Sequence, residues 1–333
     1  MVRKSRETSL FVFGNGFDLE HGYDTRYSDF KEWLMTAPDG EGFVGQFEDA
    51  LEQLRGELPD FISYLPNAED YYESDNWLWS NLEKALGCLP NACEEAFYKT
   101  EIGFSSLHEN CPEMGDDVEN NSGERETVQS IIEFPNLNTI IDDFYTQLSD
   151  WIESVDSRIH GSSFVGTWSR PFQHGDKALT FNYTHTLEEI YKIPRSEILH
   201  IHGESGSVTN PIILGHDIEP PSDLFDGSEA YKIVDSVYGY STRRTAKDTE
   251  SIIERNGSWF NSLKGVDNVL VYGHSLNKLD HPYFLRLMEA TRSTSWFIYV
   301  HGSDTVPRRL SEKAQEEKIR LHERDDKEFW VRS

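Results

Sequence analysis

The sequence has few basic residues for its length. Its 333 residues include 31 Lys and Arg but 59 Asp and Glu, which gives a formal net charge of -28. Affinity for a phosphate backbone depends on Lys and Arg side chains that displace counterions, so a chain this acidic repels nucleic acid. The composition therefore argues against direct nucleic-acid binding.

Cysteines and long apolar runs are also scarce. Cys88, Cys93 and Cys111 cannot all pair and lack the paired C-x-x-C spacing of a zinc knuckle, which indicates free thiols in a reducing compartment and no structural zinc. The apolar run after the basic start covers only residues 10–13, far short of a signal-peptide core. No run approaches the roughly 20 apolar residues of a membrane span. We expect a cytoplasmic protein with no membrane association.

What is present is a series of short apolar runs, most of them followed by helical segments. The composition is 37% hydrophobic and 13% aromatic, which is enough for a real core. Near-continuous apolar runs that alternate with helices are typical of a parallel sheet covered on both faces. We predict an α/β fold with a Rossmann-like parallel sheet and strands at residues 10–13, 178–182, 198–202, 212–214, 269–272 and 296–300.

The middle of the chain has a different pattern. Residues 38–174 contain amphipathic helical stripes and acidic loops, and the β-rich pattern resumes afterwards. We therefore predict a nucleotide-binding core formed by residues 1–37 and 175–333, interrupted by a large acidic helical insertion at 38–174.

Polar residues follow most of the predicted strands. In open parallel sheets, ligands collect at the carboxyl ends of the strands. The candidates after the successive strands are Gly14, Asn15, Gly16, Phe17 and Asp18; Thr180, Asn182 and Thr184; His202 and Gly203; Gly215, His216 and Asp217; and Gly273, His274 and Ser275.

The first of these turns offers two interpretations. Gly14 and Gly16 allow a sharp turn and a close approach to a diphosphate, with the free N–H groups of a helix start beyond. The dinucleotide fingerprint G-x-G-x-x-G is not satisfied, because its sixth position is Leu19. A tight strand-to-helix turn without a ligand is the alternative.

His202 and Asn182 are the candidates for chemistry. An imidazole such as His202 can take a proton from a hydroxyl or water, although a hydrogen-bonded strand histidine has the same sequence pattern. The Asn182 amide can orient a water or a sugar hydroxyl, or it can cap the helix that follows. Strand alternation predicts that His200 and His202 share one face.

The sequence also contains residues for two other chemistries. A metal site is chemically sensible but has no closely fitting spacing; its ligands would be His200, His202, His216 and Asp217, or His274. Ser275 and Asp280 could act as nucleophile and acid, but Asn277 replaces the closing glycine of a G-x-S-x-G elbow. A serine hydrolase is therefore disfavoured.

Five segments together resemble the AbiH family of bacterial phage abortive-infection proteins. They are FVFGNGFDLEHGYDTRYSDF, LTFNYTHTLEEIY, LHIHGE, ILGHD and VYGHSLNKLDHPYF, in this order. The resemblance covers both ends of the α/β core and leaves the acidic middle unmatched.

That family in turn resembles the sirtuins and the sirtuin-like defence NADases. Gly14 to Gly16 match the glycine turn, and the later motifs match at Thr180 and Asn182, at His202 and Gly203, and at Gly273 and Ser275. The resemblance implies NAD in the cleft, with Asn182 and His202 at the nicotinamide ribose. Asp18 and Thr184 depart from the sirtuin pattern, which has serine and aspartate there, and the cysteine quartet for zinc is missing. This favours hydrolysis of the nucleotide over protein deacylation.

We therefore predict an anti-phage abortive-infection effector that cleaves the nicotinamide-ribose bond of NAD or a related nucleotide. Asn182 and His202 would be catalytic, and the strand-end residues would hold the nucleotide. The rival hypotheses are a metal-dependent phosphodiesterase that uses the histidine cluster and a non-catalytic nucleotide sensor. Expected partners are a phage-derived trigger or a defence protein, and a second copy of the chain in a homo-oligomer.

Overall fold

A computed structural model describes residues 7–56, 77–80, 82–87, 137–159, 168, 170–216, 239–302 and 305–330. The chain divides into two compact units. The first consists of residues 1–26, 149–213 and 248–333, and the second of residues 27–148 and 214–247. Cys88, Cys93, Cys111 and most of the predicted acidic insertion lie outside the described residues. The domain limits predicted from the sequence stay a prediction.

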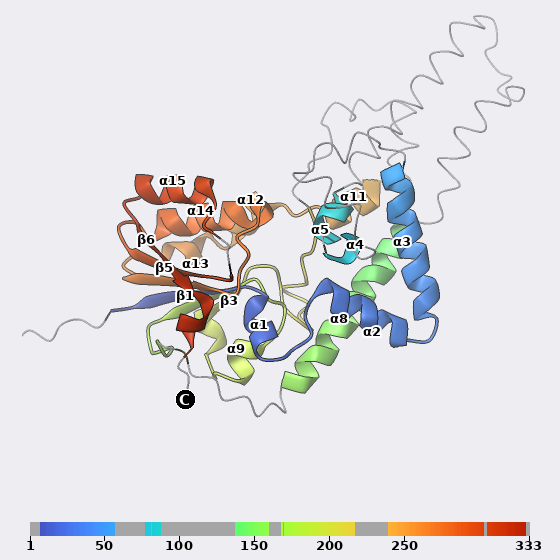
Figure 1. Cartoon of the computed structure of the whole chain (residues 1–333), viewed down its shortest axis with the longest axis horizontal. Helices are drawn as coiled ribbons and strands as arrows, with labels where there is room; N and C mark the ends of the chain where they lie inside the picture. Colours follow the sequence, from blue (N-terminus) through green and yellow to red (C-terminus); the bar gives the residue numbers. More distant parts are fainter. Residues whose placement is uncertain are drawn as a thin grey trace, which may run out of the picture. The chain divides into compact units, whose positions relative to one another are not determined.

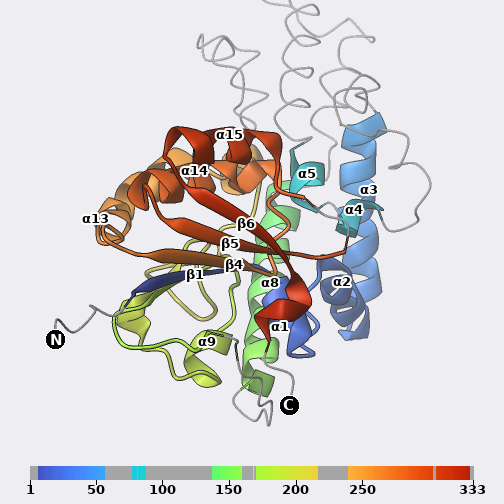
Figure 2. The same cartoon turned by 60° about the vertical axis from the view of Figure 1, so that its left-hand side comes forward.

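A six-stranded parallel sheet forms the centre of the first unit (Figures 1 and 2). The strand order is β3-β2-β1-β4-β5-β6, and every neighbouring pair is parallel. This is the strand order of doubly wound dinucleotide-binding sheets. In such sheets the second and third strands are added on one side of the first strand, and the later strands are added on its other side. The strands are β1 (Ser9–Phe13), β2 (Lys177–Thr180), β3 (Ile198–His200), β4 (Asn268–Tyr272), β5 (Ser295–Val300) and β6 (Arg320–Asp325).

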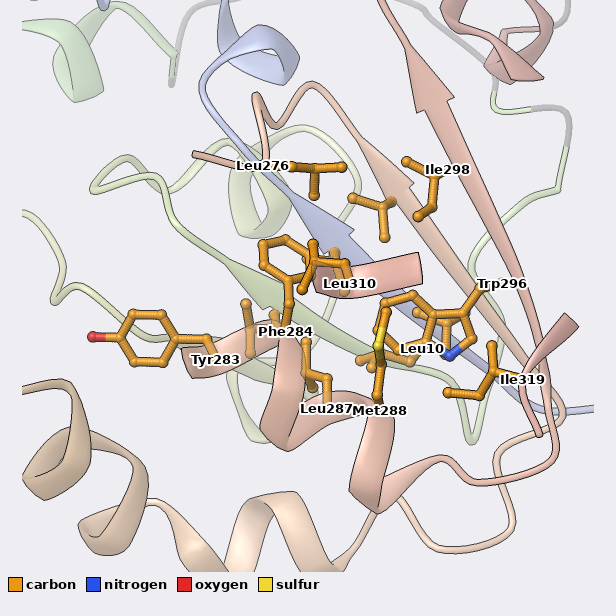
Figure 3. Packing of buried hydrophobic residues seen from close by; sticks show 14 of the residues in the cluster. Leu10, Leu276, Tyr283, Phe284, Leu287, Met288, Trp296, Ile298, Leu310 and Ile319 are labelled. Atoms are coloured by element: carbon orange, nitrogen blue, oxygen red, sulfur yellow. The ribbon is translucent and has the colours of Figure 1, made fainter. Parts of the chain in front are cut away.

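One face of the sheet is covered by helices from the C-terminal part of the chain. They are α12 (Thr249–Arg255), α13 (Gly257–Asn261), α14 (His281–Ala290) and α15 (Arg308–Glu316). Fully buried Phe284 and Leu287 of α14 pack with Leu10, Trp296 and Leu310 (Figure 3). Successive strand residues point to opposite faces of the sheet, so Leu10 and Val12 of β1 both belong to this core.

Aromatic residues dominate the opposite face. Phe11 and Phe13 of β1 pack against Trp168, at ring-centroid distances of 5.2 Å each. The covering elements are α1 (Gly16–Glu20), α9 (Thr186–Glu189) and the short helix η8 (Asp326–Phe329). Figures 1 and 2 show α14 and α15 on one side of the sheet and α9 on the other. Both faces are therefore closed, as the continuous apolar strands require.

The second unit is helical in its described part. Stacked rings of Phe47 and Phe144, with centroids 4.7 Å apart, lie in its core beside Phe30 and Trp79. Its helices are α2 (Tyr27–Thr36), α3 (Gly40–Gly56), α4 (Trp77–Ser80), α5 (Leu82–Leu86), α11 (Tyr240–Thr245) and the first half of α8 (Leu137–Ile159). The unit boundary falls inside α8, so that residues 149–159 belong to the first unit.

The predicted α/β fold with a parallel sheet is confirmed. Five of the predicted strands form within two residues of their expected limits. The prediction of a strand at 212–214 is wrong, because this segment has no regular structure. Strand β6 was missed, because its residues are mostly polar and it lies at the exposed edge of the sheet. Among the described helices, none combines the length and the apolar character that crossing a bilayer demands.

Leu287→Ala should lower the free energy of unfolding by about 2–5 kcal/mol, because it removes a fully buried side chain from a packed core. Urea unfolding followed by tryptophan fluorescence measures the change. Glu289→Ala in the same helix is the control, since its side chain is 41% exposed and should change stability by less than about 0.5 kcal/mol. Equal losses in both variants would contradict the described packing of α14.

Candidate functional site

The turns after β1 and β4 touch each other through their backbones. The Gly14 N–H donates to the Tyr272 carbonyl at 3.0 Å, and the Gly16 N–H donates to the Gly273 carbonyl at 2.8 Å. A Cβ on Gly14 would lie 2.7 Å from the Gly273 oxygen, and one on Gly16 would lie 2.7 Å from the Gly273 Cα. Gly273 itself has a φ of +68°, which disfavours any side chain. Glycine is required because the two chain segments leave no room between them.

This contact explains the glycines without a ligand. The N–H groups of Gly14 and Gly16 already have acceptors, and the Phe17 N–H donates to the Gly14 carbonyl at 2.9 Å. Helix α1 has only five residues, so it adds little dipole to the turn. Diphosphate binding at this turn stays a prediction, and the interpretation as a tight strand-to-helix turn gains weight.

Asn15 and Phe17 have structural contacts of their own. The exposed Asn15 exchanges hydrogen bonds with Thr25 through both ends of its amide, at 3.0 and 2.7 Å. Phe17 is buried, 4.4 Å from the Phe13 ring and stacked on Trp330. These contacts hold the turn together and do not support a role for either side chain in nucleotide binding.

Asp18 is buried beside three residues of the turn that follows β2. Its carboxylate accepts hydrogen bonds from the Thr184 hydroxyl at 2.5 Å and the Thr186 hydroxyl at 2.7 Å, and the Asn182 amide also bonds to it. Burial raises the pKa of Asp18 to about 6, against the opposing effect of these donors. The predicted residues Asp18, Asn182 and Thr184 are thus brought together, and Thr186 joins them.

A buried array of His202, Asp280 and His274 lies at the ends of β3 and β4. One carboxylate oxygen of Asp280 is 3.4 Å from His202 Nε2, and the other is 3.3 Å from His274 Nε2. His274 Nδ1 accepts from the Leu276 N–H at 2.8 Å, so the proton of a neutral His274 is on Nε2 and faces Asp280.

The surroundings of this array are apolar. The Phe181 ring lies 5.0 Å from the His202 ring and 4.2 Å from the His274 ring, and Tyr283 also packs on His202. The three side chains of the array are each at most 6% exposed. The Asp280 carboxylate thus lies close to two imidazole rings in an apolar environment, where the attraction between opposite charges is stronger than in water.

His200 and His202 do not share a face. Strand β3 ends at His200, whose Nε2 lies 3.0 Å from Glu188 of α9, whereas His202 faces Asp280 at the start of α14. Helices α9 and α14 cover opposite sides of the sheet. The prediction from strand alternation is wrong because the strand stops before the second histidine.

The remaining predicted residues are dispersed. Thr180 Oγ1 accepts from the Asn182 N–H at 3.0 Å, Gly203 turns with a φ of +85° and Ser275 is exposed. His216 lies in the second unit, where Thr245 contacts its ring, and Asp217 lies outside the described residues. Asn182 does not cap α9, whose N-cap is His185.

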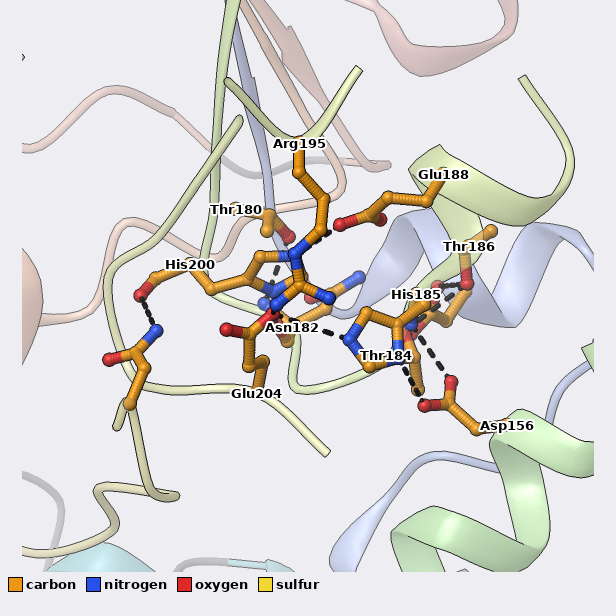
Figure 4. Close-up of polar contacts among 12 residues, drawn as sticks. Asp156, Thr180, Asn182, Thr184, His185, Thr186, Glu188, Arg195, His200 and Glu204 are labelled. Atoms are coloured by element: carbon orange, nitrogen blue, oxygen red, sulfur yellow. Dashed lines mark hydrogen bonds and ion pairs between the residues drawn. The ribbon is translucent and has the colours of Figure 1, made fainter. Parts of the chain in front are cut away.

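A second polar cluster was missed by sequence reasoning. His185 contacts Asp156 at 2.6 Å and Glu204 at 3.3 Å, while Arg195 bonds to Glu204. The hydrogen bond to Asp156 raises the pKa of His185 to about 9 despite its burial. Its members come from α8, the turn after β2, the short helix η4 (Arg195–Glu197) before β3 and the turn after β3 (Figure 4). The one sequence feature that points to this cluster is the THTLEE segment, in which two glutamates follow His185.

Comparison with known families accounts for most of the chain. The model of the family described as bacteriophage abortive infection AbiH matches residues 10–300. The chain belongs to the AbiH family. Comparison with curated proteins finds no match.

The AbiH match includes the whole candidate site. It runs from β1 to the end of β5 and covers Asp18, Asn182, His202, His274 and Asp280. The predicted family and its role in phage abortive infection are confirmed at this level. The further likeness to sirtuins stays a prediction.

Gly16→Ala should destabilise this AbiH protein by about 1–3 kcal/mol, because the new methyl group would overlap the backbone of Gly273. Chemical denaturation measures the loss. Gly257→Ala is a matched control, since Gly257 also begins a five-residue helix but has nothing within 4 Å of the added Cβ. The control should be neutral or stabilised by up to about 1 kcal/mol.

Asp18→Asn should change how stability depends on pH. The folded-state pKa of Asp18 is about 6 and the ordinary value is 3.8, so between these pH values the folded state holds more protons than the unfolded state. The contribution of Asp18 to stability is therefore most favourable at low pH and falls by up to about 3 kcal/mol as the pH rises through 6.

Denaturation of the wild type and Asp18→Asn at several pH values between 4 and 8 measures this effect. The difference in unfolding free energy should move in favour of the variant as the pH rises. Asp150→Asn, at an exposed position of α8, serves as the control and should give a constant difference. A constant difference for Asp18→Asn as well would show that its carboxyl is not buried as described.

Proposed function

We propose that this AbiH protein cleaves the nicotinamide-ribose bond of NAD, or of a closely related nucleotide, during abortive infection. The observation that carries the proposal is the buried pairing of His202 with Asp280, which is braced by His274. A histidine held by a buried carboxylate is suited to accept a proton at neutral pH and to carry the resulting charge.

The position of the pair supports a nucleotide substrate. The pair lies at the carboxyl edge of a sheet with the strand order of dinucleotide-binding domains, which is where such sheets bind ligands. Asn182 and His202 each lie two residues beyond the register pair Thr180 and His200, so the two side chains follow neighbouring strands. We propose that one nucleotide ribose lies against both strand ends.

In the proposed reaction, the C1′–N bond of NAD breaks and its electron pair stays on the nicotinamide ring, which leaves as a neutral molecule. Positive charge builds on the ribose, as in glycoside hydrolysis. Water attacks C1′, and its proton passes to His202, whose charge Asp280 stabilises. Asn182, fixed by its bond to Asp18, orients the ribose or the water. The products are nicotinamide and ADP-ribose.

The glycine turns serve this site indirectly. By bringing the ends of β1 and β4 into contact, Gly14, Gly16 and Gly273 set the positions of Asp18 and His274. Neither a metal nor a serine nucleophile is needed for this chemistry. We place the reaction in the cytoplasm, within a homo-oligomer that responds to a phage-derived trigger or a defence partner.

The test is nicotinamide release from NAD, measured by chromatography with purified protein in the presence and absence of phage lysate. His202→Gln should lower the rate by about 10²–10⁴-fold, the usual contribution of a general base. Asn182→Ala should lower it as well. Asp280→Asn should lower the rate and shift its pH profile, because Asp280 acts through His202.

His174→Gln is the control, since His174 is an exposed histidine of the same unit and should leave the rate unchanged. Circular dichroism verifies that each variant is folded. Undiminished nicotinamide release by both His202→Gln and Asn182→Ala would refute the proposal. Tight NAD binding without any release, even with lysate, would favour a nucleotide sensor.

A further inference from the structure

Three ligating side chains converge beside His200. One ligand atom from each of His185, Glu188 and Glu204 lies within 4.8 Å of the others. The side chains are 17%, 11% and 9% exposed, so that little water screens the two carboxylates. Figure 4 shows them approaching from α9 and from the turns that follow β2 and β3. Within the described residues, this is the only group of three or more such side chains.

Asp156 fixes the orientation of the His185 side chain. Its Nδ1 lies 2.6 Å from one oxygen of Asp156, and its backbone N–H donates to the other oxygen at 2.8 Å. A metal-binding histidine typically donates its second ring N–H to a carboxylate in this way. Nε2 is thereby directed toward Glu204, 3.3 Å away. Ligand atoms bound to one metal at bond lengths of about 2.0–2.2 Å lie roughly 3.0–3.5 Å apart.

Glu188 supplies a second, independent observation. Its Oε1 lies 3.0 Å from His200 Nε2, but its Oε2 is buried and has no hydrogen-bond partner among the described residues. A buried carboxylate oxygen without a donor is costly and is relieved by a cation. Because Oε1 bonds to His200, Oε2 is the oxygen that, within the described part of the chain, still lacks a positive partner.

The charged groups around the cluster have an excess of negative charge that a cation would compensate. Asp156, Glu188 and Glu204 face the His185 ring and Arg195, whose side chain is 61% exposed and bonds to Glu204. Arg195 therefore competes with an ion for Glu204, and its exposed side chain can turn into solvent when an ion binds. A divalent ion in place of the His185 proton would compensate the remaining negative charge.

We propose that His185, Glu188 and Glu204 bind one divalent transition-metal ion, with Asp156 as the positioning residue for His185. One imidazole and two carboxylates suit Mn²⁺ or Zn²⁺. The ion would fasten α9 and the turn after β2 to the turn after β3, which carries His202. This site goes beyond the proposed NAD cleavage, because it needs no nucleotide and uses other residues.

Titration of the full chain, freed of metal by a chelator, with Mn²⁺ alone tests the site. Electron paramagnetic resonance of free Mn²⁺ should show one equivalent bound per chain, which Zn²⁺ displaces. Glu188→Gln should weaken binding at least tenfold, and Asp156→Asn by about 10–100-fold. Glu323→Gln, an exposed glutamate of β6, is the control and should bind as the wild type does.

Arg195→Gln separates a metal site from an ionic network that is already complete. Because Arg195 competes for Glu204 and its side chain is largely exposed, this variant should fold and bind Mn²⁺ more tightly than the wild type. Binding that is unchanged or weaker in Arg195→Gln would overturn the proposal. So would a wild-type chain that binds no single equivalent, or only weak binding that Glu188→Gln does not alter, as the acidic surface alone would give.

Discussion

The close approach of the β1 and β4 turns is the constraint on which the rest of the site depends. Two backbone hydrogen bonds join Gly14 and Gly16 to the end of β4, at distances that exclude any Cβ on either glycine. The strands on both sides of this contact form the centre of the parallel sheet, where its order reverses. Asp18 and His274 lie in or directly after these two turns. The backbone contact between the turns therefore sets the positions of these polar residues at the carboxyl edge, without any contribution from their side chains.

Three buried acids near this edge are held in three different ways. Asp18 accepts from hydroxyl groups, which compensate its burial only in part, so its pKa stays raised. Asp280 lies between two histidines in an aromatic environment. Asp156 forms a short ion pair with His185. These three carboxylates thus have different partners, and in our proposals the partner decides whether the carboxylate fixes a turn, stabilises a base or orients a ligand.

Much of the fold could be predicted from the sequence, because the sheet is buried on both faces. Continuous apolar runs such as LFVF and VLVY are typical of central strands, and the polar residues that follow them indicate where the carboxyl ends of these strands lie. The exposed strand β6 has no such run, and residues 212–214 are apolar without pairing to a neighbour. Strand pairing depends on a partner elsewhere in the chain, which local apolar character does not encode.

The sequence by itself determined the α/β class and the AbiH family, and it placed Asp18, Asn182, His202 and His274 after predicted strands. Only the tertiary structure decided which of them meet. Asp280 joins His202 to His274 from the start of α14, and Asp156 reaches His185 from α8. These partners lie from 6 to 78 residues apart in the chain. Packing of the strands and helices, rather than any local spacing, brings their charges within a few ångströms, and that is why the sequence does not disclose the pairs.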